Sequence, residues 1–234
     1  MMSRVKLGAL VMGQSPRPEI EAMVHSIADD EIELDLRGAL DGLSRAEIDA
    51  LPPVDDGDTI FTRLPNGDGV RISKRAIIAH GTDTLQALAD AGNGVTMVMC
   101  TGDFPDWMDR FRVVFPSRTL HATVRSLRPS GRLGVFTPLA EQCRKSEARW
   151  RAAGYDTRVV PLSPNADADE TRQAAMALRD HRPDLLVLDC MSYTRDTKRI
   201  VRDVVGAPAI LALSSAIRTA LEHHPIKLNR EGSS

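Results

Sequence analysis

The amino-acid sequence predicts an α/β protein made of two similar lobes, with parallel sheets and a cleft between the lobes. Short apolar stretches alternate with helical stretches of roughly 10–15 residues, a pattern typical of βαβ units. Parts of the first half recur in the second half at fixed offsets. Apolar residues make up 42% of the 234 residues, enough to form a buried core in each lobe.

The first half is expected to contain the strands of one parallel sheet, together with a hairpin. The run Val5–Met12 is short and continuously apolar, as in a buried strand, whereas 31–36 alternates between apolar and polar residues. Ser44 and Glu47 form a capping box at the start of a helix. Pro65–Asp68 is a good hairpin turn. The expected elements are strand 5–12, helix 17–27, strand 31–36, helix 44–50, the hairpin strands 58–64 and 69–73, helix 73–91 and strand 95–100.

The second half repeats the alternation without a hairpin. Gly154 ends a helical stretch, and 184–189 is another continuous apolar run. Strands separated by such helices form parallel sheets that are covered on both faces. The expected elements are helix 118–127, strand 132–136, helix 139–153, strand 156–160, helix 167–180, strand 184–189, helix 194–205, strand 208–211 and helix 213–222.

A weak internal repeat relates the two halves. Leu7–Gly8 recurs as Leu133–Gly134 at an offset of 126 residues, whereas Cys100 and Cys190 are 90 residues apart. The difference of 36 residues corresponds to an insertion in the first half, at about 38–73. We therefore expect an N-terminal lobe at 1–115 and a C-terminal lobe at 116–205. The final strand and helix, at about 206–224, are expected to pack back on the first lobe.

Cys100 and Cys190 each end an apolar strand, at the sheet edge where α/β proteins bind ligands. The residues that follow, Thr101 and Ser192 among them, are small or hydroxylic and suit a carboxylate. Two opposed thiols could act as base and acid on the carbon next to that carboxylate. The alternative is that both are small buried hydrophobes. Cys143, in a polar helical stretch, is interpreted as structural or incidental.

The loop after the first strand supplies further candidates for binding a carboxylate. Gln14 and Ser15 could donate hydrogen bonds to it, and Arg17 could neutralise it. Ser15 followed by proline is also an ordinary helix start. Thr137 occupies the equivalent loop of the second half. Asp189 could face away from the neighbouring thiol, raise its pKa or accept its proton, and the sequence leaves this open.

Composition excludes several other classes of protein. A net charge of -2 and an aromatic content of 4% disfavour nucleic-acid binding. No apolar run approaches the ~18 residues of a membrane helix, and three cysteines are too few for a disulfide scaffold. A cytoplasmic protein with reduced thiols is expected, with a homo-oligomer left open. His223 and His224 have no third ligand at metal spacing, and the chain has no phosphate loop, so no metal or cofactor is expected.

Several segments resemble the AroM family, within the aspartate/glutamate/hydantoin racemase superfamily. They include LGALVMGQSPRPEI, DTIFTRLPNGDGVRISKR and LLVLDCMSY. The resemblance implies two pseudo-symmetric flavodoxin-like lobes with the active site between them. In the superfamily, the positions that match Cys100 and Cys190 are the acid/base pair of cofactor-independent racemases. Relatives with a changed pair carry out isomerase or decarboxylase chemistry on small dicarboxylates.

The chain also departs from the racemase pattern. Racemases typically follow the first cysteine with Asn-Thr and the second with Thr-His, whereas here Thr101–Gly102 and Met191–Ser192 follow. We expect a cofactor-independent racemase or isomerase that acts on a small carboxylate. The alternatives are a non-catalytic protein that binds a small carboxylate in the same cleft, and a decarboxylase or cis-trans isomerase that uses one cysteine.

Overall fold

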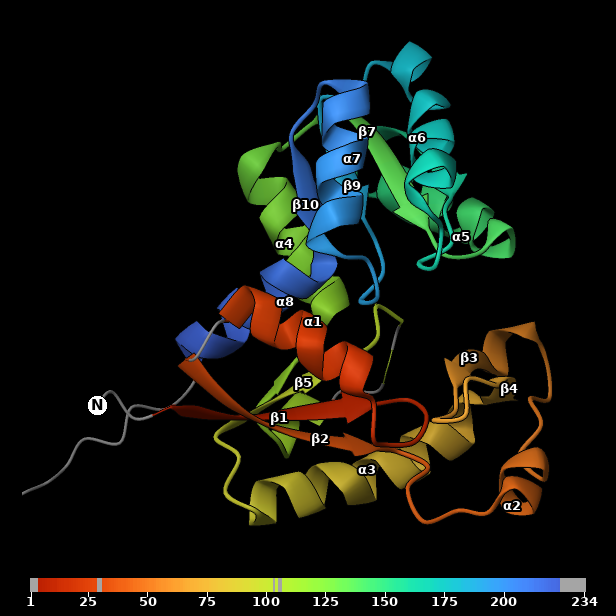
Figure 1. Ribbon diagram of the computed structural model, residues 1–234, viewed down its shortest axis with the longest axis vertical. Coiled ribbons are helices and arrows are strands. Elements are labelled where there is room, and N and C mark those ends of the chain that lie inside the picture. Colours follow the sequence, from red (N-terminus) through yellow and green to blue (C-terminus); the bar gives the residue numbers. More distant parts are fainter. Residues whose placement is uncertain (1–3, 29–30, 103, 105–106, 224–234) are drawn as a thin grey trace, which may run out of the picture.

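The computed structural model describes residues 4–28, 31–102, 104 and 107–223, and it shows two α/β lobes joined along one boundary (Figure 1). The first lobe contains β1 (Val5–Val11), α1 (Pro18–Ala28), β2 (Ile32–Gly38), α2 (Arg45–Asp49), β3 (Thr59–Arg63), β4 (Gly69–Ser73), α3 (Lys74–Asp90), β5 (Val95–Val98) and β6 (Val113–Val114). The second part of the chain contains α4 (Pro116–Leu127), β7 (Gly131–Thr137), α5 (Ala140–Ala152), β8 (Tyr155–Pro161), α6 (Ala168–Met176), β9 (Leu185–Leu188), α7 (Arg195–Val205), β10 (Ala209–Leu211) and α8 (Ala212–His223).

Each lobe is built on a parallel sheet of four strands. The strand order is β2-β1-β5-β6 in the first lobe and β8-β7-β9-β10 in the second. Strand β1 thus corresponds to β7, β2 to β8, β5 to β9 and β6 to β10. Along the chain, the four strands of each sheet are arranged in the same way. This arrangement confirms the predicted α/β class with two pseudo-symmetric lobes.

Strand register confirms the internal repeat residue by residue. Leu7 of β1 pairs with Val95 of β5, and Leu133 of β7 pairs with Leu185 of β9. These partners are related by the two offsets of 126 and 90 residues that the sequence predicts. The repeat therefore places Cys100 and Cys190 at equivalent points beyond β5 and β9.

Glycines at equivalent positions allow close packing in the two central strands. A Cβ on Gly8 would lie 2.4 Å from the Thr96 side-chain oxygen, and a Cβ on Gly134 would lie 2.8 Å from a methyl of Leu186. A side chain at either position would collide with the neighbouring strand, which is why glycine occurs there. The Leu-Gly pair that reveals the repeat thus has a packing cause.

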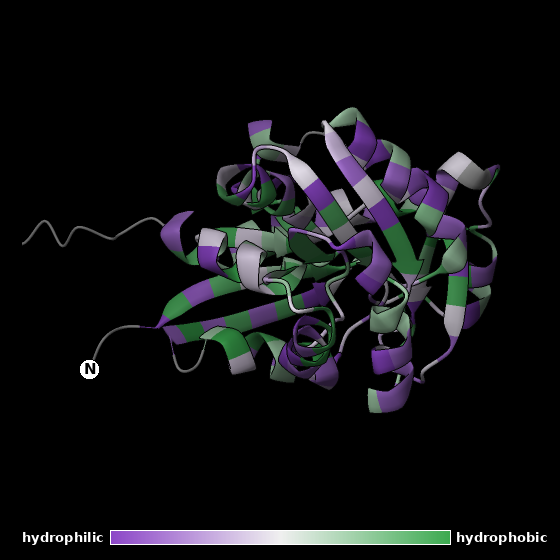
Figure 2. Cartoon of the chain, turned by 90° about the horizontal axis from the view of Figure 1, so that it is seen from above, coloured by the Kyte–Doolittle hydropathy of each residue, from purple (hydrophilic) through white to green (hydrophobic). Residues whose placement is uncertain are grey.

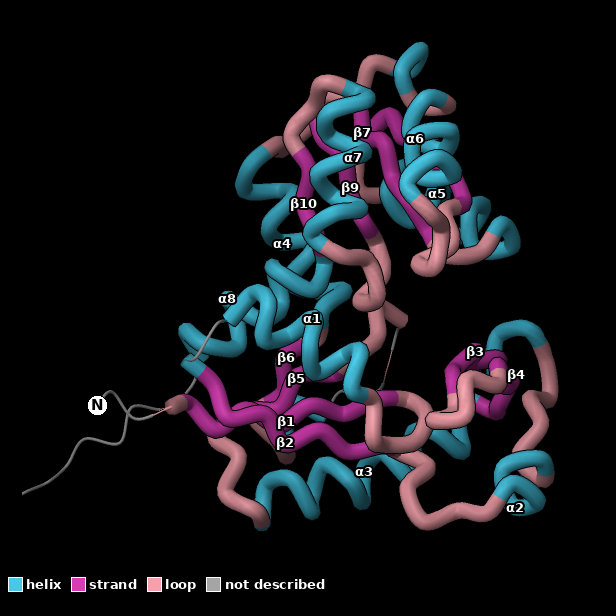
Figure 3. The backbone as a smooth tube through the Cα atoms, viewed as in Figure 1, coloured by secondary structure: helices cyan, strands magenta, loops and turns pink. Residues whose placement is uncertain are grey.

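The predicted insertion lies between β2 and α3. It holds α2, whose capping box between Ser44 and Glu47 is confirmed, and the antiparallel β3–β4 hairpin. Figure 3 shows the hairpin as a separate small sheet beside the carboxyl ends of β1 and β2. The sequence misses β6, because two residues are too short for any periodicity. The helix expected over 167–180 ends at Met176 and is followed by a 3-10 turn at Arg179–His181.

The end of the chain differs from the prediction. Strand β10 pairs with β9 and completes the second sheet, so the expectation that this strand packs on the first lobe is wrong. A short crossover through α7 places the next parallel strand beside β9. Helix α8 lies between the lobes and contacts α1 and β5 as well as α4 (Figure 1). His224 lies outside the described residues.

The central strands of both sheets form much of the hydrophobic core. All four residues of β9 are buried, as are those of β5. Figure 2 shows hydrophobic residues on the interior strands, whereas the surrounding helices alternate between hydrophobic and hydrophilic positions. Within the described part of the chain, none of the helices combines the length and apolar character needed to span a membrane.

Asp35 of β2 offers a test of electrostatics in the first lobe. Its carboxylate accepts hydrogen bonds from Arg37 at 2.9 and 3.0 Å and from Asn93 at 2.8 Å. The bonds from Arg37 hold the pKa of Asp35 below its usual value of 3.8. A depressed pKa stabilises the fold above pH 3.8, and this contribution is lost as the pH falls through the folded-state value.

We expect Asp35→Asn to lower the free energy of unfolding by about 0.5–1 kcal/mol at pH 7, because the pair is partly exposed. The difference between variant and wild type is expected to shrink in acid below pH 3.8. Urea unfolding at neutral and acidic pH measures both values. An equal difference at both pH values would contradict this account of Asp35.

Candidate active site

The ends of β5 and β9 meet where the two lobes join. The Thr101 hydroxyl donates a hydrogen bond to the main-chain carbonyl of Asp189 at 3.5 Å. Thr101 directly follows Cys100, and Asp189 directly precedes Cys190. This link therefore brings the two predicted catalytic segments together from opposite lobes. Both cysteines are partly buried, and neither forms a disulfide.

The two sulfurs accept the same kind of backbone hydrogen bond. The N–H of Gly102 donates to the Cys100 sulfur at 3.3 Å, and the N–H of Ser192 donates to the Cys190 sulfur at 3.4 Å. In each case the donor lies two residues after the cysteine. A backbone N–H stabilises a thiolate, so both turns are suited to a sulfur that exchanges a proton.

Burial sets the protonation state of Cys190. It raises the pKa of this thiol to about 12, although the amide of Ser192 acts in the opposite direction. The negative charges of Cys100 and Asp189 raise this pKa further. Cys190 is therefore a thiol at neutral pH.

The Asp189 side chain forms a buried ion pair with Arg149 of α5. The carboxylate is thus held by a helix that packs on β7 and β8. Burial raises the pKa of Asp189, whereas the charge of Arg149 favours the carboxylate. Sequence reasoning missed Arg149, since no local pattern relates a residue on α5 to one at the end of β9.

Two of the predicted binding residues hold a neighbouring loop. The Gln14 side-chain amide donates to the carbonyls of Leu40 at 3.0 Å and Leu43 at 2.8 Å. The N–H and the hydroxyl of Ser15 both donate to the carboxylate of Asp41, each at 2.7 Å. These donors connect the loop after β1 to the turn after β2. A role of Gln14 or Ser15 in binding a carboxylate stays a prediction.

Arg17 lies at the junction between this loop and the insertion. Its side chain is only 12% exposed and pairs with Glu19. One of its guanidinium nitrogens donates to the main-chain carbonyl of Arg63, at the end of β3, at 3.2 Å. The hairpin also reaches the second lobe, where Arg71 of β4 forms an exposed ion pair with Glu141 of α5 at 3.2 Å.

Thr137 ends β7 and is buried against the start of α5. Its hydroxyl lies 3.4 Å from the sulfur of Cys143 and 3.5 Å from the carbonyl of Leu139. Cys143, interpreted from the sequence as structural or incidental, thus contacts a predicted binding residue. The sequence offered no sign of this contact, because it depends on how α5 turns back along β7.

Tyr193 is a further residue that sequence reasoning passed over. It is fully buried, and its hydroxyl donates to the carbonyl of Leu162 at 2.6 Å. Burial raises its pKa, and the neighbouring Cys190, Asp189 and Cys143 add to this effect. Its place three residues after Cys190, within the LLVLDCMSY segment, was the available signal.

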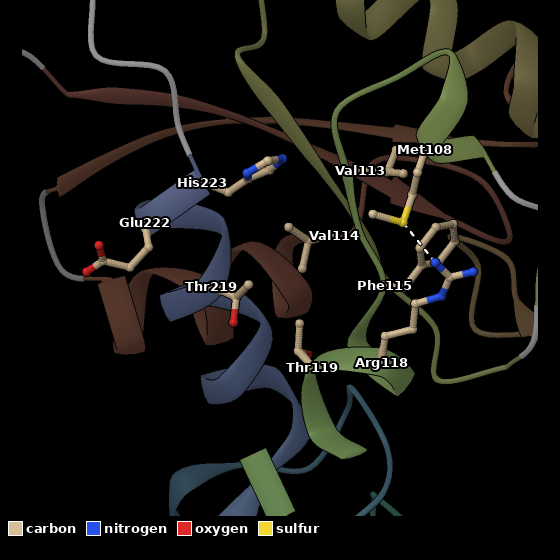
Figure 4. A pocket seen from close by; sticks show the side chains of 9 residues that line it. All are labelled: Met108, Val113, Val114, Phe115, Arg118, Thr119, Thr219, Glu222 and His223. Carbon is tan, nitrogen blue, oxygen red and sulfur yellow. Dashed lines mark hydrogen bonds between the residues drawn. The ribbon is translucent and has the colours of Figure 1, made fainter. Parts of the chain in front are cut away.

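A cavity of about 350 Å³ lies elsewhere, at the outer edge of the first sheet (Figure 4). It is lined by Met108, Val113, Val114, Phe115, Arg118, Thr119, Thr219, Glu222 and His223. None of the predicted site residues belongs to this lining. Among the residues that the structure describes, no group of three or more His, Cys, Asp or Glu side chains is placed to hold a metal ion.

Two parallel α/β lobes each bring one cysteine segment to their common boundary. The model of one family, described as AroM protein, matches residues 7–223. The chain belongs to the AroM family, as the sequence predicted. A search of the curated proteins finds no match.

Solved structures share the fold at low sequence identity. Arylmalonate decarboxylase is 13% identical with a TM-score of 0.64, over 95% of this chain and 93% of the other. Maleate isomerase from Pseudomonas putida S16 is 13% identical with a TM-score of 0.62, over 94% and 92% of the two chains. Allantoin racemase from Pseudomonas fluorescens is 13% identical with a TM-score of 0.56, over 98% and 99%.

Proposed function

We propose that the protein is a cofactor-independent racemase or related isomerase of a small carboxylate, with Cys100 and Cys190 as an opposed acid/base pair. The observation that carries this proposal is the matched placement of the two sulfurs. Each lies just beyond an equivalent strand and accepts a hydrogen bond from the amide two residues on. The Thr101–Asp189 hydrogen bond joins the two segments across the lobes.

The reaction needs only proton transfers. The Cys100 thiolate removes the proton from the carbon next to the carboxylate, which leaves a Cys100 thiol and a carbanion delocalised over the carboxylate. The Cys190 thiol then donates its proton to the opposite face of that carbon and becomes a thiolate. Proton exchange with water restores the starting forms. No electron acceptor or donor is consumed.

The binding residues predicted from the sequence would hold the substrate carboxylate. Thr101, Ser192 and Thr137 offer hydroxyl groups at strand ends, and Arg17 offers a positive charge. Gln14 and Ser15 would act through the loop that they support. Reduced thiols are required for the reaction, which fits the cytoplasm as the compartment.

A second candidate is supported by the high pKa of Cys190. A decarboxylase or cis-trans isomerase needs only one cysteine that gives or takes a proton, and a protonated Cys190 suits the donor of such a step. Two of the solved structures that share the fold are named as a decarboxylase and an isomerase. At this identity, the similarity supports the fold and leaves the activity to experiment.

Exchange at the α-carbon tests the proposal. Wild-type protein is incubated in deuterated water with a panel of amino and hydroxy acids, and deuterium at the α-carbon is followed by NMR. At least one of these acids is expected to gain deuterium. The double variant Cys100→Ala/Cys190→Ala is expected to lose at least about a hundredfold in rate, a typical acid/base contribution. Thr219→Val, at the cavity of Figure 4, serves as the control that keeps its rate.

Exchange that persists in the double variant would rule out the cysteine pair. A ligand that raises the melting temperature without exchange, decarboxylation or cis-trans isomerisation would instead indicate the non-catalytic binding protein. Loss of carbon dioxide that depends on Cys190 alone would indicate the one-cysteine reaction.

A further inference from the structure

The two lobes are joined differently on the two sides of their boundary. On one side lies α8, which contacts α1 and β5 of the first lobe and β10 of the second. The side of α8 that packs between them is apolar and buried, and burial of apolar surface makes this junction durable. On the other side lies the β3–β4 hairpin. Figure 1 shows α8 to the left of the boundary and the hairpin to the right.

The hairpin reaches the second lobe through two polar contacts. Arg71 of β4 pairs with Glu141, at the start of α5, at 3.2 Å. The two terminal nitrogens of the Arg63 guanidinium lie 2.7 and 3.1 Å from one side-chain atom of Asn165, between β8 and α6. Because a guanidinium only donates hydrogen bonds, that atom is the amide oxygen. Both contacts therefore lie where the chain leaves strands of the second sheet at their carboxyl ends.

The hairpin is fixed to the first lobe by close packing. Its buried apolar side chains belong to a cluster whose other buried members all lie within 1–115. These side chains are Ile60, Leu64, Val70 and Ile72. The loop after β1 adds a tight contact, since a Cβ on Gly13 would lie 2.5 Å from the main-chain oxygen of Arg63. The hairpin is therefore built into the first lobe.

The contacts with the second lobe are of a weaker kind. The side chains of Arg71 and Glu141 are 62% and 61% exposed, and Arg63 and Asn165 are exposed as well. Exposed ion pairs contribute little to stability, and salt screens them. Contacts of this kind can break and re-form while the hairpin stays packed on the first lobe.

We propose that the β3–β4 hairpin is a reversible clasp, carried by the first lobe, that closes on the second lobe through Arg71–Glu141 and Arg63–Asn165. The clasp extends from the loop after β1 to the start of α5, which follows the equivalent strand β7. Cys100 and Cys190 follow the neighbouring strands β5 and β9 at the same edges of the two sheets. Opening gives a small molecule access to this edge. The admission of a substrate rests on the proposed function, whereas the movement of the hairpin does not.

Pulsed electron paramagnetic resonance measures the position of the hairpin without any substrate. Every protein carries Cys100→Ala, Cys143→Ala and Cys190→Ala, together with two introduced cysteines that bear spin labels. The reporting pair is Pro65→Cys in the hairpin turn and Met176→Cys at the end of α6.

A second pair of labels, Pro65→Cys and Ala87→Cys, joins the hairpin turn to α3 of the first lobe and is the matched control. All three labelled positions are exposed. Arg202→Glu on α7 controls for the change in net charge, because Arg202 is 54% exposed and pairs with Asp203 of the same helix. This variant is expected to leave both distances unchanged.

Like charges are expected to open the clasp. Arg71→Glu and Glu141→Arg, each alone, are expected to raise the ratio of long to short hairpin–α6 distances about fivefold. Arg63→Ala is expected to act in the same direction. The double variant Arg71→Glu/Glu141→Arg restores an ion pair with its charges exchanged, and is expected to restore the original distances. The hairpin–α3 distance is expected to stay the same throughout.

A hairpin–α6 distance that either Arg71→Glu or Arg63→Ala leaves unchanged would overturn the proposal, as would an exchange of charges that does not restore it. An equal change in the hairpin–α3 distance would also overturn it, because the hairpin would then not be carried by the first lobe.

Salt provides a measurement that needs no substitution in the clasp itself. Raising NaCl to about 1 M is expected to lengthen the hairpin–α6 distance, because screening weakens the exposed ion pair. If Arg71→Glu does not fold, a distance that salt leaves unchanged would decide against the clasp. A clasp that opens as expected, combined with no exchange of any acid in deuterated water, would refute the proposed function alone.

Discussion

Cys100→Ala is expected to lose both deuterium exchange and inversion, whereas Cys190→Ala is expected to lose inversion and keep exchange. Cys100 is the proposed base, so without it no carbanion forms. Without Cys190, the base can still remove the proton and return a deuteron to the same face. Each lost function is expected to fall by about 10²–10⁴-fold, the usual contribution of a positioned acid or base.

Chiral chromatography and mass spectrometry on one reaction mixture separate the two events. Inversion appears as the opposite enantiomer, and exchange appears as a gain in mass of the starting enantiomer. Equal loss of exchange in the two single variants would contradict the assignment of base and donor. Inversion that survives in either variant would contradict the two-cysteine mechanism itself.

Trp150→Ala is expected to lower the free energy of unfolding by about 3–5 kcal/mol, the usual cost of truncating a buried aromatic side chain. Trp150 of α5 is fully buried. Its ring stacks on His121 at 3.9 Å between centroids and meets Tyr155 edge-on at 6.0 Å. Alanine would leave a cavity between α4, α5 and β8 that these rings cannot fill.

Urea unfolding followed by circular dichroism measures this effect without relying on tryptophan fluorescence. Leu127→Ala is the control, because Leu127 is 62% exposed and its truncation is expected to cost no more than about 0.5 kcal/mol. A cost below about 1 kcal/mol for Trp150→Ala would show that this cluster does not support the second lobe.

The arrangement of elements was largely predictable from local patterns. Strands and helices in α/β proteins are bounded by short signals, such as the Ser44–Glu47 capping box, that act within one turn. The repeat was also readable, because Gly8 and Gly134 are both required by close packing of neighbouring strands. Strand β6 escaped prediction because its two residues are ordered by pairing with β5.

The candidate site was predictable only in outline. The carboxyl ends of parallel strands meet at one edge, so the sequence could place Cys100 and Cys190 there. The side-chain contacts of the other predicted site residues could not be predicted in this way. Ser15 binds Asp41, 26 residues away, and Thr137 meets Cys143 because α5 turns back along β7. Contacts of this kind depend on helix rotation and loop path, which have no local signature.

By itself, the sequence determined the α/β class, the two related lobes, the insertion and the pair of cysteines at equivalent strand ends. Hydrophobic periodicity and glycine positions encode these features, since both act over short distances along the chain. Only the tertiary structure decided that β10 completes the second sheet and that Arg149 holds Asp189 beside Cys190. Packing brings these residues together from separate elements, and no local pattern in the sequence records such contacts.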